Sequence, residues 1–84
     1  MARFFLHLFN QIGAVPDDEG TEVPDIATAR HLAVQSVRDI LSEEAKHGVI
    51  DLGGRIEIAD EGGATLDVVP FASAVELRLG KHRP

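Results

Sequence analysis

Apolar residues near the start of the chain predict a buried β-strand. Residues 3–9 hold three of the four phenylalanines, and both faces of an extended segment there would be mostly apolar. Such a strand lies inside a sheet or has a helix on one face and a partner on the other. Turn-forming residues then surround a short return strand at 14–15. Residues 21–23 are expected to be extended because Pro24 disfavours a helical predecessor.

One long amphipathic helix is predicted next. Asp25 suits its N-cap, and Gly48 suits the position just after its C-terminus. Apolar residues between them recur at helical spacing within about 120° of the helix surface, and we expect this stripe to face the core. The stripe consists of Ile26, Ala29, Ala33, Val37, Ile40 and Leu41. The expected helix is about 22 residues and roughly 33 Å long.

A β-hairpin is predicted after the helix. Its strands would span residues 55–59 and 64–69, joined by a glycine-containing turn at 60–63. The alternation of apolar and polar residues in the second strand predicts that Leu66 and Val68 face the core.

The segment after the hairpin carries two periodicities. Phe71 and Val75 have helical spacing, whereas Val75, Leu77 and Leu79 have strand spacing. We expect a short helical turn followed by an extended end. Residues 81–84 are expected to be a frayed tail.

These elements predict an α+β fold over residues 1–80, which would form a single domain. The expected architecture is a small antiparallel sheet of about 3–4 strands with one long helix packed across one face, in the order β-(β)-α-β-β. One helix covers only one face of a sheet. An apolar face left open on so small a domain favours self-association or a protein partner.

Composition narrows the possible functions. The chain has 84 residues, which is room for one domain, and 44 % of them are hydrophobic, as in ordinary globular proteins. The absence of cysteine excludes disulfides, thiolate chemistry and cysteine-ligated metals. The net charge of −6 disfavours a plain nucleic-acid-binding surface. The apolar run at residues 4–9 is too short for a signal peptide or a membrane span, so we expect a cytoplasmic protein.

No catalytic set is recognisable in the sequence. The serines lie outside any Gly-x-Ser-x-Gly motif, and the two Gly-Gly pairs lack the pattern of a phosphate-binding loop. None of the four histidines pairs with another at the spacing of metal ligands. We therefore predict that the protein is not an enzyme, with no catalytic residue, no metal site and no cofactor.

Four residues are candidates for interaction or ligand binding: His7, Asp17, Asp18 and Arg30. Asp17 and Asp18 belong to an acidic loop, which is better explained as a solvated turn than as a calcium site. Arg30 falls inside the apolar stripe of the helix, and we expect its guanidinium to pair with Asp17 or Asp18. A phosphate or carboxylate ligand is the alternative. His7 is expected to bond a backbone carbonyl or a nearby acid.

Three stretches of the sequence resemble a known family. They are Arg-Phe-Phe-Leu-His-Leu at residues 3–8, Pro-Asp-Asp-Glu-Gly-Thr-Glu-Val-Pro-Asp at residues 16–25, and Ile-Glu-Ile-Ala-Asp-Glu-Gly-Gly at residues 56–63. Together they are similar to a group of short proteins from rhizobium-type and related alphaproteobacteria, classed as a domain of unknown function. The resemblance implies a single domain and supplies no activity, cofactor or catalytic residue.

The leading hypothesis is therefore a small, non-catalytic protein-interaction module that self-associates, with a homodimer or another protein as the partner. One alternative is a nucleic-acid-associated or antitoxin-like regulator, which would use the basic residues Arg3, Arg78, Lys81 and Arg83. The other alternative is a binder of a small ligand or metal ion at the acidic loop and Arg30.

Overall fold

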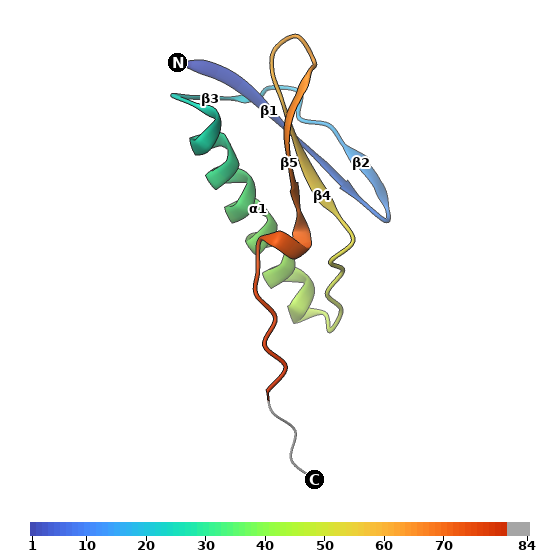
Figure 1. Ribbon diagram of the computed structural model, residues 1–84. Helices are drawn as coiled ribbons and strands as arrows, with labels where there is room; N and C mark the ends of the chain where they lie inside the picture. Colours follow the sequence, from blue (N-terminus) through green and yellow to red (C-terminus); the bar gives the residue numbers. More distant parts are fainter. Residues whose placement is uncertain (81–84) are drawn as a thin grey trace.

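An antiparallel sheet with one helix across one face makes up the computed structural model, which describes residues 1–80 (Figure 1). The predicted α+β fold class is confirmed. The frayed tail predicted at residues 81–84 lies outside the described residues. In chain order the elements are β1 (Ala2–Asn10), β2 (Gly13–Val15), β3 (Thr21–Val23), α1 (Ile26–Lys46), β4 (Arg55–Ala59), β5 (Thr65–Pro70) and the 3-10 turn η1 (Phe71–Ser73).

Strand β1 is the centre of the sheet. The strand order is β2-β1-β4-β5, and β3 also pairs with β1. β4 lies antiparallel to residues 5–9 of β1, whereas β2 pairs with residues 8–10 and β3 with residues 2–4. The sheet has five strands rather than the expected three or four, because the extended residues 21–23 pair with β1.

Helix α1 packs on the sheet through small and branched side chains. Asp25 caps it as predicted, because its Oδ1 accepts from the Thr28 N–H at 2.8 Å and from the Thr28 hydroxyl at 2.7 Å. Its buried residues are Ala29, Ala33, Val37 and Leu41. Ile26 and Ile40, also predicted to face the core, fall within the same arc of the helix surface but are not fully buried. Ile26 is exposed and Ile40 is only half-buried.

The hairpin forms as predicted, but its second strand faces the other way. Leu66 and Val68 are 49 % and 38 % exposed, whereas Val69 is fully buried. The reason is tertiary: Phe71 is also fully buried, and its N–H donates to the Gly54 carbonyl at 2.9 Å. Because side chains alternate along a strand, burying Phe71 and Val69 turns Val68 outward. A register shift in the hairpin then leaves Leu66 without a partner on β4.

The chain after the hairpin also follows the expected order. The short helical turn is present as η1, and residues 75–80 follow it without regular secondary structure. Arg38 of α1 donates from Nε to the Ala74 carbonyl at 2.8 Å, which fixes the start of this segment on the helix. Among the described residues, no helix combines the length and the apolarity that crossing a membrane requires.

The contact between Gly54 and Phe71 is a sensitive point of the fold. A Cβ added at Gly54 would lie 2.6 Å from the Phe71 ring, which is closer than real side chains approach. We expect Gly54→Ala to lower the free energy of unfolding by about 1–3 kcal/mol, because the ring has no free space into which to move. Urea unfolding followed by circular dichroism measures this. Gly62→Ala is the matched control, since its Cβ would make only an ordinary contact. Equal stability of both variants would contradict the account.

Candidate functional site

The loop between β2 and β3 is held against β1 by the side chain of Asp17. Its Oδ2 accepts from the Leu6 N–H at 3.1 Å, at a residue of β1 that neither β2 nor β3 reaches. Its Oδ1 accepts from the N–H groups of Glu19 and Gly20 at 3.3 and 3.0 Å. In return, the Asp17 N–H donates to Nδ1 of His7 at 3.0 Å. The Asp17 carboxylate therefore accepts a hydrogen bond from β1 at a position where neither β2 nor β3 can do so.

These contacts determine the charge state of Asp17. Partial burial raises the pKa of its carboxyl, but the hydrogen bonds from the N–H groups of Leu6, Gly20 and Glu19 outweigh burial and hold the pKa below its usual value. His7 thus has a backbone N–H as its partner, not the carbonyl or acid that we expected. Asp18, in the same loop, is exposed.

Arg30 does not pair with the acidic loop, and the predicted partner was wrong. Its Nη1 lies 2.7 Å from Oδ2 of Asp67 on β5. The inverted facing of β5 explains this, because Asp67 shares the helix-covered face with its strand neighbour Val69. The Arg30 hydrogen bond, with a second one from the Val68 N–H, lowers the pKa of Asp67. The structure thus brings His7 and Asp17 together and leaves Arg30 with another partner.

Side chains also form hydrogen bonds with backbone groups along β5. The Val68 N–H donates to Asp67 Oδ1 at 2.8 Å, and the Val68 carbonyl accepts from Arg30 at 3.4 Å. The Pro70 carbonyl accepts from the Ser73 hydroxyl at 2.7 Å. Unpaired backbone groups of an edge strand invite pairing with another chain, and side chains that bond them oppose it. β5 is therefore an edge strand at which side-chain hydrogen bonds oppose pairing with another chain.

The face of the sheet opposite α1 carries a row of rings. Phe4 is in the core beneath the helix, so the alternation along β1 places Phe5, His7 and Phe9 on the other face, where all three are half-buried. The rings of Phe5 and His7 stack, with centroids 6.3 Å apart and planes 13° from parallel. We call the surface formed by this row and its charged neighbours on β3 and β4 the open face.

Two ion pairs flank this row. The guanidinium carbon of Arg55 lies 4.3 Å from the centroid of the Phe9 ring, in the geometry of a cation–π contact. Arg55 also pairs with Glu57 at 2.7 Å, and Arg3 pairs with Glu22 at 2.7 Å. In the register of β1 and β4, Arg55 stands beside Phe9 and Glu57 beside His7. The open face therefore combines aromatic surface with charges of both signs.

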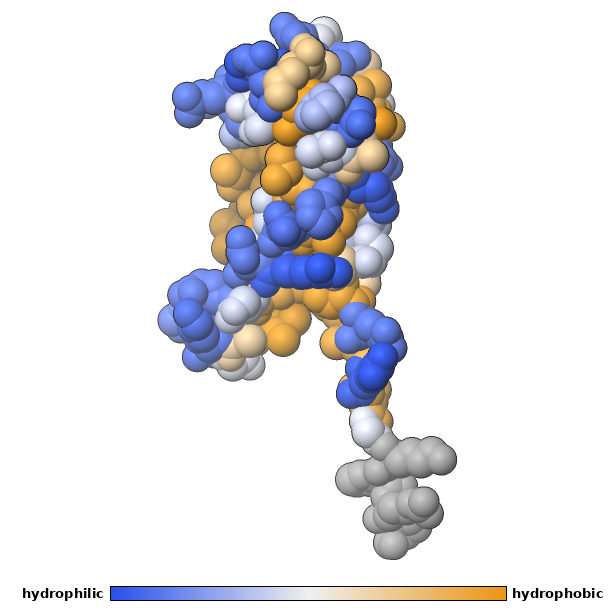
Figure 2. Space-filling view, turned by 90° about the vertical axis from the view of Figure 1, so that its left-hand side faces the viewer, coloured by the Kyte–Doolittle hydropathy of each residue, from blue (hydrophilic) through white to orange (hydrophobic). Residues whose placement is uncertain are grey.

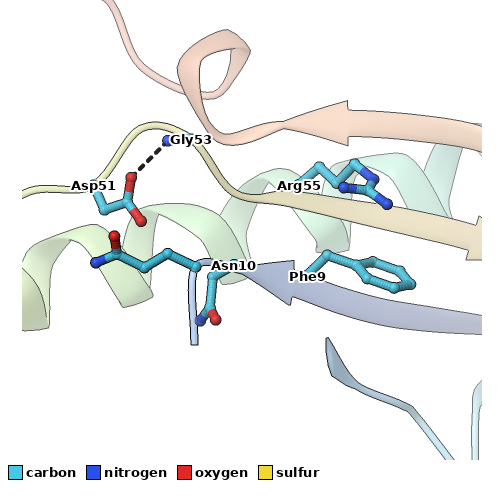
Figure 3. A pocket seen from close by; sticks show the side chains of 6 residues that line it. Phe9, Asn10, Asp51, Gly53 and Arg55 are labelled. Carbon is cyan, nitrogen blue, oxygen red and sulfur yellow. Dashed lines mark hydrogen bonds between the residues drawn. The ribbon is translucent and has the colours of Figure 1, made fainter. Parts of the chain in front are cut away.

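A small hollow of about 190 Å³ lies at one end of the open face. Its lining residues are Phe9, Asn10, Gln11, Asp51, Gly53 and Arg55. Figure 3 shows the Arg55 guanidinium and the Phe9 ring directed the same way, with Asn10 and Asp51 farther along the hollow. Asp51 accepts from the Gly53 N–H at 2.9 Å, which fixes that wall. This hollow could not be predicted from the sequence, because only the pairing of β1 with β4 brings its two sides together.

Other candidate sites are not assembled in the part of the chain that the structure describes. No three His, Asp or Glu side chains among residues 1–80 are arranged to hold a metal ion. Arg3 pairs with Glu22 and Arg78 with Glu76, and Figure 1 shows β1's start and the segment after η1 at opposite ends of the molecule. Lys81 and Arg83, the other basic candidates, lie outside the described residues.

Comparison with known protein families gives a match over most of the chain. The model of a family described as "Domain of unknown function (DUF6894)" matches residues 3–72, which is most of the chain. No curated protein and no solved structure matches the chain significantly.

The Asp17 contacts predict how stability depends on pH. Because the folded state lowers the Asp17 pKa, the ionised carboxylate stabilises the fold above its unfolded pKa of about 3.8, and this contribution is lost as the pH falls through the lower folded value. We expect Asp17→Asn to cost about 1–3 kcal/mol at pH 7 and progressively less below pH 4.

Urea titrations at several pH values, read by circular dichroism, measure this difference. Asp18→Asn removes a charge from the same loop at an exposed position and is the matched control, for which we expect little change. A cost for Asp17→Asn that did not shrink in acid would contradict the assigned role of the carboxylate.

Proposed function

Since the chain belongs to the DUF6894 family, whose function is unknown, its role must be inferred from its surface, and we propose a non-catalytic protein-interaction module that self-associates through its open face. The observation that carries this proposal is the row of Phe5, His7 and Phe9 on the sheet face that α1 does not cover. Aromatic and arginine side chains are enriched at protein interfaces, where they supply most of the binding energy.

The size of the open face supports a modest interface. β1 has nine residues and is about 30 Å long, and four adjacent strands are about 15 Å wide between the axes of the outer two. The flat area is therefore roughly 450 Å², whereas a stable complex buries about 800 Å² on each partner. Sheet contact alone would bind weakly, so we expect another part of the chain to contribute to a stable dimer.

The polar groups of the open face favour binding over catalysis. Nδ1 of His7 is engaged by the Asp17 N–H, and the arginines and glutamates are paired with one another. No serine, threonine or cysteine occurs among the residues of this row, so His7 has no nucleophile beside it there.

The alternative functions have less support. The ligand-binding hypothesis required Arg30 beside the acidic loop, and Arg30 is bonded to Asp67 instead. The nucleic-acid hypothesis uses Arg3 and Arg78 among its basic residues, and these two are paired with Glu22 and Glu76, at opposite ends of the molecule. A cytoplasmic location and an alphaproteobacterial source stay predictions.

Light scattering of the intact chain across a concentration series tests self-association. We expect a particle of twice 9.1 kDa at concentrations above about 10 µM, as for a weak interface. Phe9→Ser removes a ring from the open face and should weaken association about tenfold or more. Val15→Ser is the control: Val15 is exposed but pairs with Leu8, which places it on the helix side of the sheet.

A chain that stays at 9.1 kDa at every concentration up to about 1 mM would overturn the proposal. A dimer weakened equally by both substitutions would show that the open face is not the interface.

A further inference from the structure

Strand β5 extends the apolar surface of the open face. In the register of the hairpin, Val68 stands beside Glu57 and Pro70 beside Arg55, so all four side chains lie on the side of the sheet opposite α1. Val68 is 38 % exposed, and Leu66, two residues before it, is 49 % exposed. The aromatic row of β1 and the apolar side chains of β5 therefore lie on either side of the charged pair on β4. Apolar surface of this extent with polar groups in it is typical of an interaction site.

The charged pair divides this surface into two neighbouring rows that cross β1, β4 and β5. We call them the basic row, which is Phe9, Arg55 and Pro70, and the acidic row, which is His7, Glu57 and Val68. Each row has an aromatic ring on β1, one charge on β4 and an apolar side chain on β5. The rows differ in the sign of the charge, and their charges bond each other at 2.7 Å. Two adjacent rows that match in shape and oppose in charge are complementary to a second copy of themselves.

We propose that two copies pack open face against open face about a two-fold axis that crosses the strands midway between these rows. The basic row of each copy then lies on the acidic row of the other, so that Arg55 pairs with Glu57 of the second copy and Phe9 stacks on its His7. This inference rests on the proposed function and assigns the register of the interface. The strands of the two copies run antiparallel, which agrees with the aligned packing of two sheets about 10 Å apart.

The charges favour this position of the axis over its neighbours. An axis along the acidic row would place Glu57 on Glu57, and an axis along the basic row would place Arg55 on Arg55. An axis that follows β4 lengthwise would bring both pairs of like charges together. An axis parallel to the strands but between β1 and β4 would place Val68 on the acidic loop at Asp17. Like charges in contact, and apolar side chains on a carboxylate, are unfavourable.

The proposed pairs also keep every charge of the interface compensated. Burial of an ion pair is costly when a charge loses its partner. Each Arg55 retains its contact with Glu57 of its own chain and gains one with Glu57 of the second copy. The four charges then alternate in sign around the axis. The side chain of Glu57 is already only 23 % exposed, so little of its hydration remains to be lost.

The same register places Phe5 of each copy on the hollow of the other. Phe9 of one copy lies on His7 of the second, so Phe5, two residues beyond His7, falls two residues beyond Phe9, at Gln11. This is the hollow of about 190 Å³, which Phe9, Gln11 and Gly53 help to line (Figure 3). A cavity of roughly 150 Å³ holds a benzene ring, so the hollow has room for a phenyl group. The Phe9 ring beside it supplies an aromatic neighbour.

Filling the hollow supplies the contact area that the strands alone lack. Its walls come from the turn after β1 and from the connector before β4, so Phe5 of the second copy contacts parts of the chain outside the sheet. Residues 75–80 do not compete for this surface. Figures 1 and 2 show the chain beyond η1 extending away from the domain, which leaves the open face uncovered by its own chain.

A charge-reversal experiment with full-length chains tests the register. We expect Arg55→Glu and Glu57→Arg each to weaken dimerisation about tenfold or more, because each places like charges across the interface. In an equimolar mixture, the two acidic side chains of the first variant face the two basic side chains of the second. We therefore expect dimers to reappear in the mixture. Recovery within one chain is not possible, because each variant still carries two like charges side by side.

The ion pair between Arg3 and Glu22 is the matched control. It lies on the same side of the sheet, but at the end of β1 that extends past the sheet of the second copy in this register. We expect Arg3→Glu and Glu22→Arg to dimerise like wild type. Weakening of the dimer by these variants as large as that by Arg55→Glu would contradict the register.

Light scattering of each variant and of the mixture, with circular dichroism to show that each chain is folded, decides between the outcomes. Charge-reversed variants that dimerise like wild type, or a mixture that associates no better than its components, would overturn the register. If Phe9→Ser still weakened the dimer, self-association through the open face would stand without it. A wild-type chain that is monomeric throughout would overturn the proposed function and this inference with it.

Discussion

One constraint shapes this molecule: β1 is apolar on both faces, and the chain has one long helix to cover them. α1 buries Phe4 together with the inward residues of β4 and β5. Phe5, His7 and Phe9 are left on the other face, half-buried by their neighbours and by the charged pairs beside them. The loop held by Asp17, the cation–π contact of Arg55 and the proposed contact with a second copy all concern this uncovered face.

Local signals in the sequence were sufficient for most of the fold. The cap at Asp25, the glycine after α1, the turn at residues 60–63 and the alternation in β1 each depend on neighbouring residues, and each appears where it was expected. The facing of β5 depends instead on the burial of Phe71 against Gly54, seventeen residues away in sequence. No periodicity within residues 64–69 carries that information, so Leu66 and Val68 were assigned to the wrong face.

The candidate site, like the fold, was predictable from local sequence only in part. His7 and Asp17 were identified as notable residues and do lie together, but the backbone groups that they bond could not be foreseen. The predicted partner of Arg30 was wrong, because the side chain of Asp67 reaches Arg30 only when β5 faces opposite to the way its own pattern indicates. The contact of Arg55 with the Phe9 ring and the hollow beside it could not be predicted, because they join residues far apart in sequence that meet only when β1 and β4 pair.

The most direct test of the central claim is a nuclear magnetic resonance experiment on a dimer of one isotope-labelled copy and one unlabelled copy. Filtered nuclear Overhauser effects report only protons of different copies that lie within about 5 Å. The account predicts cross-peaks between the Phe5 and Phe9 rings of one copy and protons of the other copy. A dimer whose rings show no intermolecular cross-peaks would contradict the claim that a second copy covers the open face.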